Sequence, residues 1–245
     1  MQDGKLLVIL PTYNESADIE RMVAAIKALG LDTGILIIDD NSPDGTGRIA
    51  DKISSGDKEV FVVHRKKKLG LGSAYICGFK FAIEHGFDYV CEMDADFSHD
   101  PKYLPEFYRY IKDYDVVTGS RYMQGVSIVN WPFGRLMLSF LANKFVKMVT
   151  GLPLSDCMGG FKCFRVSFIK QIGPQNIISA GYVFQMEMLY RAFKAGCRIK
   201  EIPIIFYNRK YGKSKMNKAE VSWSFFLVLY LRFLFLFKGH KGTRR

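Results

Sequence analysis

Two aspartates one residue apart, Asp94 and Asp96, directly follow the apolar run 89–93. A hard divalent cation such as Mg²⁺ or Mn²⁺ binds one or two protein carboxylates and completes its shell with water and substrate phosphates. A helix cap or a solvated turn is the alternative role for such a pair. The pair therefore predicts a metal site for a phosphate-bearing substrate, and the surrounding elements must decide between these roles.

Two arginines are candidate phosphate ligands. Arg121 follows Gly119-Ser120 at the end of an apolar run, and Arg135 opens a run of apolar residues at helical spacing. A guanidinium group matches two phosphate oxygens at once, although most arginines are plain surface charges. The basic stretch 209–215 predicts either a loop that closes over a diphosphate or a flexible basic loop. His99 lies near the aspartates and is interpreted as a structural residue.

These residues depend for their positions on strands that alternate with helices. Apolar runs predict strands at 6–10, 35–38, 60–63, 89–93, 116–117 and 202–206. Helical spacing predicts helices at 19–29, 49–53, 72–85, 103–112, 136–149 and 183–195. The alternation predicts an α/β protein with a doubly wound, mostly parallel sheet flanked by helices. Ligands bind beyond the carboxyl ends of such strands, and the polar residues at those ends therefore converge.

The charge balance indicates the class of partner. The chain has 35 Lys and Arg against 24 Asp and Glu, a net charge of +11. Such a balance favours phosphate-bearing partners: nucleic acid, anionic lipid or nucleotide. The basic residues flank apolar helices rather than alternating with exposed aromatics, which favours lipid and excludes nucleic acid. Five cysteines without a Cys-x-x-Cys pair predict reduced thiols in a cytosolic setting.

The C-terminal region contains the apolar run 223–237. It is shorter than the roughly 20 residues of a spanning helix, and Arg232 interrupts it. A tryptophan at one end and basic residues at the other predict association with a membrane interface. A full span, a buried core helix and a dimer seam are the alternatives. The helix 136–149 likewise faces either the core or a bilayer.

Two common nucleotide-binding motifs are missing. Gly70 and Gly72 are followed by Tyr75 where a dinucleotide-binding fingerprint needs a third glycine. Gly212-Lys213-Ser214 lacks the earlier glycine of a phosphate loop. Neither a dinucleotide-dependent dehydrogenase nor a P-loop ATPase is therefore favoured.

Taken together, the motifs resemble family 2 glycosyltransferases of the GT-A fold. The matching strings in the first half are PTYNE at 11–15, IIDDNSPDGT at 37–46, GLGSA at 70–74 and DAD at 94–96. Later strings resemble polyprenyl-phosphate mannosyltransferases, the group that includes dolichyl-phosphate mannose synthases. They are GSR at 119–121, Arg135, SDCMGGFKCFR at 155–165, GYVFQMEMLYRA at 181–192 and YGKSKM at 211–216.

The resemblance implies roles for individual residues. The residues implied to hold the nucleoside are Pro11, Tyr13 and Glu15, with Ile38 and Asp40 on the base and ribose side. Those implied to bind the metal and the donor diphosphate are Asp94 and Asp96, with Arg209 and Lys215 clamping the diphosphate. Arg121 and Arg135 are implied to grip the lipid phosphate. Ser98 stands where many relatives have Gln, so a metal role is not carried over to it.

The resemblance also implies the reaction: inverting transfer of mannose from GDP-mannose to a polyprenyl (dolichyl) monophosphate, with Mg²⁺ or Mn²⁺. We expect residues 1–220 to form the catalytic domain and 221–245 a membrane-associating helix with a basic tail. The expected location is the cytoplasmic face of a membrane, with anchoring that is weak or shared with a small subunit. The alternatives are transfer of glucose to the same acceptor, a sugar nucleotidyltransferase and a non-catalytic membrane-binding subunit.

Overall fold

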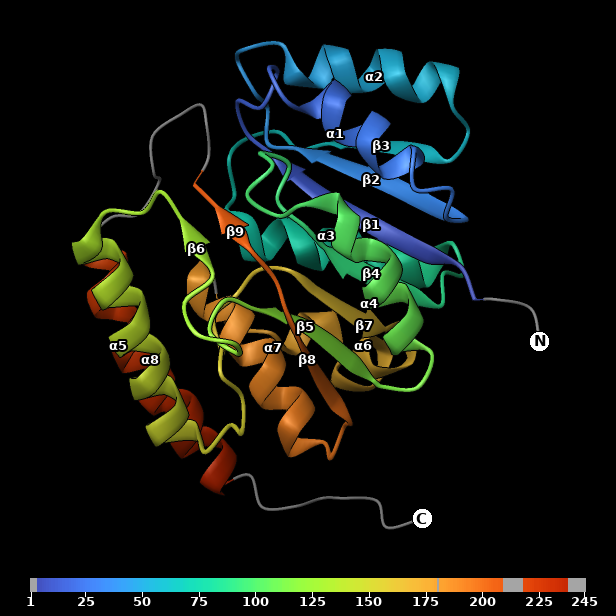
Figure 1. Ribbon diagram of the computed structural model, residues 1–245. Helices are drawn as coiled ribbons and strands as arrows, with labels where there is room; N and C mark the ends of the chain where they lie inside the picture. Colours follow the sequence, from blue (N-terminus) through green and yellow to red (C-terminus); the bar gives the residue numbers. More distant parts are fainter. Residues whose placement is uncertain (1–3, 180, 209–217, 238–245) are drawn as a thin grey trace.

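The computed structural model describes residues 4–179, 181–208 and 218–237. Its main sheet has seven strands in the order β3-β2-β1-β4-β7-β5-β8 (Figure 1). These strands are β1 (Leu6–Thr12), β2 (Thr33–Asp39), β3 (Val60–His64), β4 (Tyr89–Glu92), β5 (Val116–Ser120), β7 (Lys162–Arg165) and β8 (Ile199–Pro203). A separate two-stranded sheet pairs β6 (Ile128–Val129) with β9 (Phe206–Tyr207).

Helices cover both faces of the main sheet. The α-helices of the described residues are α1 (Ile19–Lys27), α2 (Thr46–Gly56), α3 (Leu71–Glu84), α4 (Leu104–Ile111), α5 (Phe133–Thr150), α6 (Val166–Ile172), α7 (Tyr182–Lys194) and α8 (Lys218–Phe237), and α5 and α8 lie outside the two layers that cover the sheet. Two short 3₁₀ turns lie at Pro101–Tyr103 and Pro174–Asn176. The predicted α/β class with a mostly parallel sheet is confirmed.

The core consists of two apolar layers, one on each face of the sheet. Along β1, Leu7 and Ile9 pack with α3, α6 and α7, whereas Val8 and Leu10 pack with α1 and α4. Alternate side chains of a strand point to opposite faces, and a strand covered on both faces is apolar at every position. This explains why the central strands read as uninterrupted apolar runs in the sequence.

Strand β7 was not predicted from the sequence. It runs antiparallel between β4 and β5, with Cys163 opposite both Cys91 and Val117. Two antiparallel steps leave β5 parallel to β4, so the carboxyl ends of β1, β2, β4 and β5 still lie at one edge. The insertion also brings the loop before β7, residues 155–161, to that edge.

Helices α5 and α8 lie side by side at one end of the molecule, away from the main sheet (Figure 1). Phe145 and Phe225 join them with ring centroids 4.9 Å apart. Val228 and Leu231 of α8 are buried against the core. The interpretation of the tail as a core helix is therefore right for one face of α8. Over the parts of the chain that the structure describes, no helix has the length and apolar character needed to cross a membrane.

Candidate active site

A cavity of about 550 Å³ lies at the carboxyl ends of the central strands. Its polar lining comprises Tyr13, Glu15, Asp40, Lys68, Asp94, Asp96, His99, Arg121, Arg135 and Gln185. Its apolar lining comprises Leu71 and Ala74 of α3, Leu138, Ala142, Phe145 and Val146 of α5, Met158, and Phe225 and Val228 of α8. The cavity therefore joins a charged region at the sheet edge to an apolar region between α5 and α8.

The turn after β4 holds the two aspartates. Phe97 has a left-handed backbone with φ 59°, which is rare for a bulky residue. This turn lets the Ser98 N–H donate to Asp96 Oδ1 at 3.0 Å. The Asp94 side chain remains 31% exposed. Ser98 itself is buried and shapes the turn.

The donor set suits Mg²⁺ or Mn²⁺ bound together with a phosphate substrate. Asp94 and Asp96 both line the cavity and provide hard carboxylate oxygens. Among the described residues there is no group of three His, Cys, Asp or Glu side chains that could hold a metal. Two protein carboxylates leave most of an octahedral shell to water and substrate oxygens, which is how Mg²⁺ is held beside phosphates.

His99 supports the backbone of Asp94. Its Nδ1 accepts a hydrogen bond from the Asp94 N–H at 3.1 Å, which assigns the ring proton to Nε2. The ring stacks on Phe161 with centroids 5.0 Å apart. Burial lowers the pKa of His99 to about 3, so the ring is neutral at physiological pH. A neutral ring with this tautomer positions the turn that bears Asp94 and Asp96.

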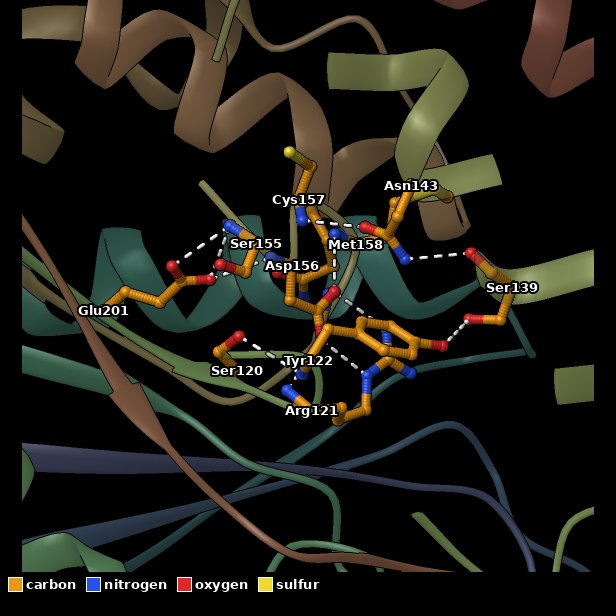
Figure 2. A network of polar contacts seen from close by, with 12 residues as sticks. Ser120, Arg121, Tyr122, Ser139, Asn143, Ser155, Asp156, Cys157, Met158 and Glu201 are labelled. Carbon is orange, nitrogen blue, oxygen red and sulfur yellow. Dashed lines mark hydrogen bonds and ion pairs between the residues drawn. The ribbon is translucent and has the colours of Figure 1, made fainter. Parts of the chain in front are cut away.

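Arg121 is held by a carboxylate that had no assigned role in the sequence. Its N–H and Nε donate to Asp156 Oδ2 at 3.1 and 2.6 Å, and its Nη2 donates to Oδ1 at 2.9 Å (Figure 2). Burial by itself raises the pKa of Asp156, but the charge and hydrogen bonds of Arg121 outweigh it and bring the pKa below its usual 3.8. The guanidinium is thus fixed in orientation at the cavity wall.

The loop that bears Asp156 is hydrogen-bonded to two elements, β8 and α5 (Figure 2). Glu201 of β8 accepts hydrogen bonds from the backbone N–H groups of Ser155 and Asp156. Asn143 of α5 accepts from the Cys157 N–H at 2.8 Å. The bonds from the Asp156 and Cys157 N–H groups satisfy backbone donors of buried residues. They also link α5 to the Arg121–Asp156 pair.

Arg135 lies on the first turn of α5 and lines the same cavity. Its guanidinium stacks on Trp131 with Cζ 3.9 Å from the ring centroid, and its Nη1 donates to Asn208 Oδ1 at 3.2 Å. Arg121 Cζ lies 5.7 Å from the same ring centroid. The structure therefore brings both predicted phosphate-binding arginines to one aromatic side chain.

The residues implied to hold the nucleoside divide into two groups. Pro11, Tyr13 and Glu15 line the cavity, and Lys68 Nζ lies 4.4 Å from the Tyr13 ring centroid. Asp40 also lines it, but its carboxylate is ion-paired with Arg65.

The remaining predicted ligands are not in the described cavity. The structure does not bring Ile38 into the cavity, because on β2 its side chain points into the core beneath α3 and is 0% exposed. Arg209 and Lys215 lie outside the described residues.

Sequence reasoning missed four residues near the charged region. Asp156 and Gln185 lie inside strings that were matched to a family, but their partners are far away in the sequence. Phe206 was only the last residue of a predicted strand, and Trp131 had no predicted role. The signal available for Asp156 was an acidic residue directly before a buried glycine-containing turn, and that signal is weak without the fold.

Comparison with known proteins gives the same assignment as the motifs. Residues 7–173 match glycosyl transferase family 2. Undecaprenyl-phosphate mannosyltransferase of Micrococcus luteus is 40% identical over 213 residues, covering 87% of this chain and 88% of that protein. Polyprenol monophosphomannose synthase of Mycolicibacterium smegmatis is 37% identical over 226 residues, covering 91% of this chain and 85% of that protein.

Solved structures share the fold at lower sequence identity. Glucosyl-3-phosphoglycerate synthase from Mycobacterium tuberculosis superposes with a TM-score of 0.68 at 18% identity, over 94% of this chain and 79% of that one. A mannosyltransferase from Pyrobaculum calidifontis, in complex with GDP-Man and Mn²⁺, gives a TM-score of 0.60 at 16% identity, over 99% of this chain and 66% of that one. The family match over most of the chain agrees with the carboxylate turn and the strand-end cavity, and this chain is a glycosyltransferase that belongs to glycosyl transferase family 2.

Proposed function

We propose that this protein transfers mannose from GDP-mannose to a polyprenyl monophosphate, with inversion at the anomeric carbon. The observation that supports this most directly is the shape of the cavity, which joins carboxylates and arginines to an apolar arm between α5 and α8. A phosphate with a long hydrocarbon chain matches both parts. The names of the two mannosyltransferases that are 40% and 37% identical to this chain favour the same acceptor and sugar.

The donor side of the reaction is assigned to the turn after β4. Asp94 and Asp96 would hold Mg²⁺ or Mn²⁺, and the bound cation would neutralise charge on the leaving diphosphate. Two structures of the same fold bind Mn²⁺ with a nucleotide sugar, which supports this cofactor class. Pro11, Tyr13 and Glu15 would face the nucleoside at the neighbouring strand end. Arg209 and Lys215 are retained from the resemblance as proposed diphosphate contacts.

The acceptor phosphate needs positioning more than activation. A phosphomonoester has a second pKa of about 6 and is largely a dianion at neutral pH. Arg121 and Arg135 would hold this dianion so that one oxygen faces the anomeric carbon from the side opposite the diphosphate. No general base is then required, and His99, with its pKa lowered to about 3 by burial, is not suited to be one at neutral pH.

The hydrocarbon chain places the reaction at a membrane. Removing such a chain from a bilayer costs about 0.8 kcal/mol per CH₂. The enzyme must therefore reach the acceptor there, and the exposed apolar residues of α5 and α8 provide the contact surface. We propose the cytoplasmic face as the location, with 1–220 as the catalytic domain and 221–245 as the membrane-associating part. A small anchoring subunit is compatible with this arrangement.

The deciding experiment follows radiolabelled mannose from GDP-mannose into a polyprenyl monophosphate in detergent, with and without EDTA. Metal-dependent label in the lipid fraction is the expected result. A parallel assay with UDP-glucose tests glucosyl transfer, and release of pyrophosphate from a sugar phosphate and NTP tests the nucleotidyltransferase. Label from glucose alone, or pyrophosphate release alone, would replace the proposal with that alternative.

A further inference from the structure

The three residues 206–208 form a bridge between the two charged parts of the cavity. On one side the Tyr207 N–H donates to the Ser98 carbonyl, in the turn that bears Asp94 and Asp96, at 3.2 Å. On the other side the Phe206 N–H donates to the Ser127 carbonyl at 2.9 Å, and the Asn208 N–H donates to Val129 O at 3.0 Å. One short segment is thus hydrogen-bonded to the metal-binding turn and to the strand that leads to Arg135.

The side chains of this segment repeat the connection. The Phe206 ring centroid lies 5.3 Å from that of His99 and 5.5 Å from that of Trp131, with an edge-to-face arrangement in both cases. Arg121 Cζ lies 5.6 Å from the Phe206 ring centroid. Asn208 Oδ1 accepts from Arg135 Nη1 at 3.2 Å. Phe206 therefore touches residues from both parts of the site.

These contacts form a continuous path through the protein. The path starts at the Asp94 N–H, which is bonded to His99, and passes through Phe206 to Trp131. It ends at Arg135, which stacks on Trp131. The aromatic members are rigid rings held at van der Waals distance, so the path has little freedom to lengthen or shorten.

We propose that Phe206 and Asn208 are positioning residues that set the separation between the carboxylates of Asp94 and Asp96 and the guanidinium groups of Arg121 and Arg135. The identity of the ligands at the two ends rests on the proposed function. Group transfer depends on the spacing of the two bound reactants, and a displacement of about 1 Å can cost about 100-fold in rate. Because these contacts fix the separation of the two ends, a change at Phe206 alters ligand binding at both of them.

The test measures binding at each end separately, without turnover. Isothermal titration calorimetry would measure the binding of Mn²⁺ with GDP for the end that bears Asp94 and Asp96. The binding of farnesyl phosphate would be measured in the same way for the end that bears Arg121 and Arg135. Phe206→Leu is expected to raise the Kd of both ligands several-fold, because it removes a ring that contacts both parts of the site. Phe206→Tyr, which keeps the ring, is expected to restore both affinities. Asn208→Ala is expected to raise the Kd of farnesyl phosphate about tenfold and to leave the Kd of Mn²⁺ with GDP unchanged.

Tyr207→Leu is the matched control, since Tyr207 is the neighbouring residue of β9 and its side chain is exposed. It should change neither affinity, and thermal unfolding of each variant checks that the fold is retained. An effect of Phe206→Leu on one ligand only, or on neither, would overturn the proposal. Intact binding without mannosyl transfer would contradict the proposed function alone. Wild-type protein that binds neither ligand would overturn both proposals.

Discussion

At the scale of single residues, the two arginines of the site are held in different ways. Arg121 is 7% exposed and pairs with the buried carboxylate of Asp156 through two parallel hydrogen bonds. Arg135 is held by an aromatic face and by the amide of Asn208. A bidentate pair fixes a guanidinium more strictly than stacking does. The guanidinium of Arg121 is therefore held more rigidly than that of Arg135.

The first prediction concerns the turn that bears Asp94 and Asp96, the proposed metal ligands. Asp96→Asn keeps an oxygen that can accept from the Ser98 N–H but removes the charge that is proposed to bind the cation. We expect turnover to fall below detection, while the thermal unfolding midpoint stays close to that of the wild type. Asp113→Asn, at an exposed aspartate away from the cavity, is the control. Full activity of Asp96→Asn would remove the metal from the mechanism.

The second prediction concerns the buried ion pair. Asp156→Asn leaves the Arg121 charge buried without a carboxylate, which typically costs about 3–5 kcal/mol. We expect urea unfolding to show a loss of about 3 kcal/mol or more. Adding Arg121→Met to Asp156→Asn should recover part of this loss, because no unpaired charge remains and the amide oxygen can still accept from the Met158 and Gly159 N–H groups. A single variant as stable as the wild type would contradict the assigned role.

The same pair predicts a pH dependence. The pKa of Asp156 in the folded protein is below 3.8, its usual value, so below about pH 4 the unfolded chain binds the proton more readily. The stability contributed by the pair is therefore complete above about pH 4 and is lost as the pH falls through the folded-state pKa. Unfolding free energies between pH 6 and pH 3 should fall less steeply in Asp156→Asn than in the wild type. Parallel curves would show that other groups set the acid limb.

At the scale of elements, α8 has two different faces. Val228 and Leu231 are buried, whereas Phe226 and Leu229 are 68% and 50% exposed. Deleting the whole helix would remove core contacts and cavity walls together with the outer face. Substitution of the outer face alone is the cleaner test of membrane contact.

The fourth prediction therefore uses Phe226→Ser with Leu229→Ser. Burial of a large apolar side chain contributes about 1.5–3 kcal/mol, so the double variant should bind vesicles at least about tenfold more weakly. Sedimentation with liposomes measures this, and circular dichroism checks the fold. Ile178→Ser removes an exposed apolar side chain outside α5 and α8 and should leave binding unchanged. Unchanged binding of the double variant would assign this face to another role, such as a dimer seam.

The strands also show which features of the fold could be predicted from the sequence and which could not. The central parallel strands were predictable because they are apolar throughout and end in polar loops. Strand β7 was not, since its four residues include Lys162, which is buried and hydrogen-bonded to Gln185 at 2.6 Å. The roles of Trp131 and Phe206 depend on contacts between segments about 75 residues apart in the numbering, which no local pattern records. Charged residues at strand ends are visible in a sequence, but the packing that orients them is not.

At the scale of the whole molecule, the net charge of +11 would add to the proposed apolar contact with a membrane. Basic residues near a membrane surface are attracted to anionic lipids. The fifth prediction is that binding to vesicles with anionic lipid weakens between 0.1 M and 1 M salt, since the screening length falls from about 10 Å to about 3 Å. Binding to neutral vesicles should respond little. Equal salt dependence on both kinds of vesicle would remove electrostatic attraction from the account.

The apolar arm of the cavity is lined by α5 and α8, two helices that also carry exposed apolar side chains. An acceptor that enters from there is counted per unit of membrane area rather than per unit of solution volume. At a fixed amount of enzyme and acceptor, added inert lipid would then dilute the acceptor in two dimensions and slow the reaction. The donor, which arrives from water, would follow ordinary three-dimensional concentration. The reaction rate would thus depend on the surface concentration of the acceptor and on the volume concentration of the donor.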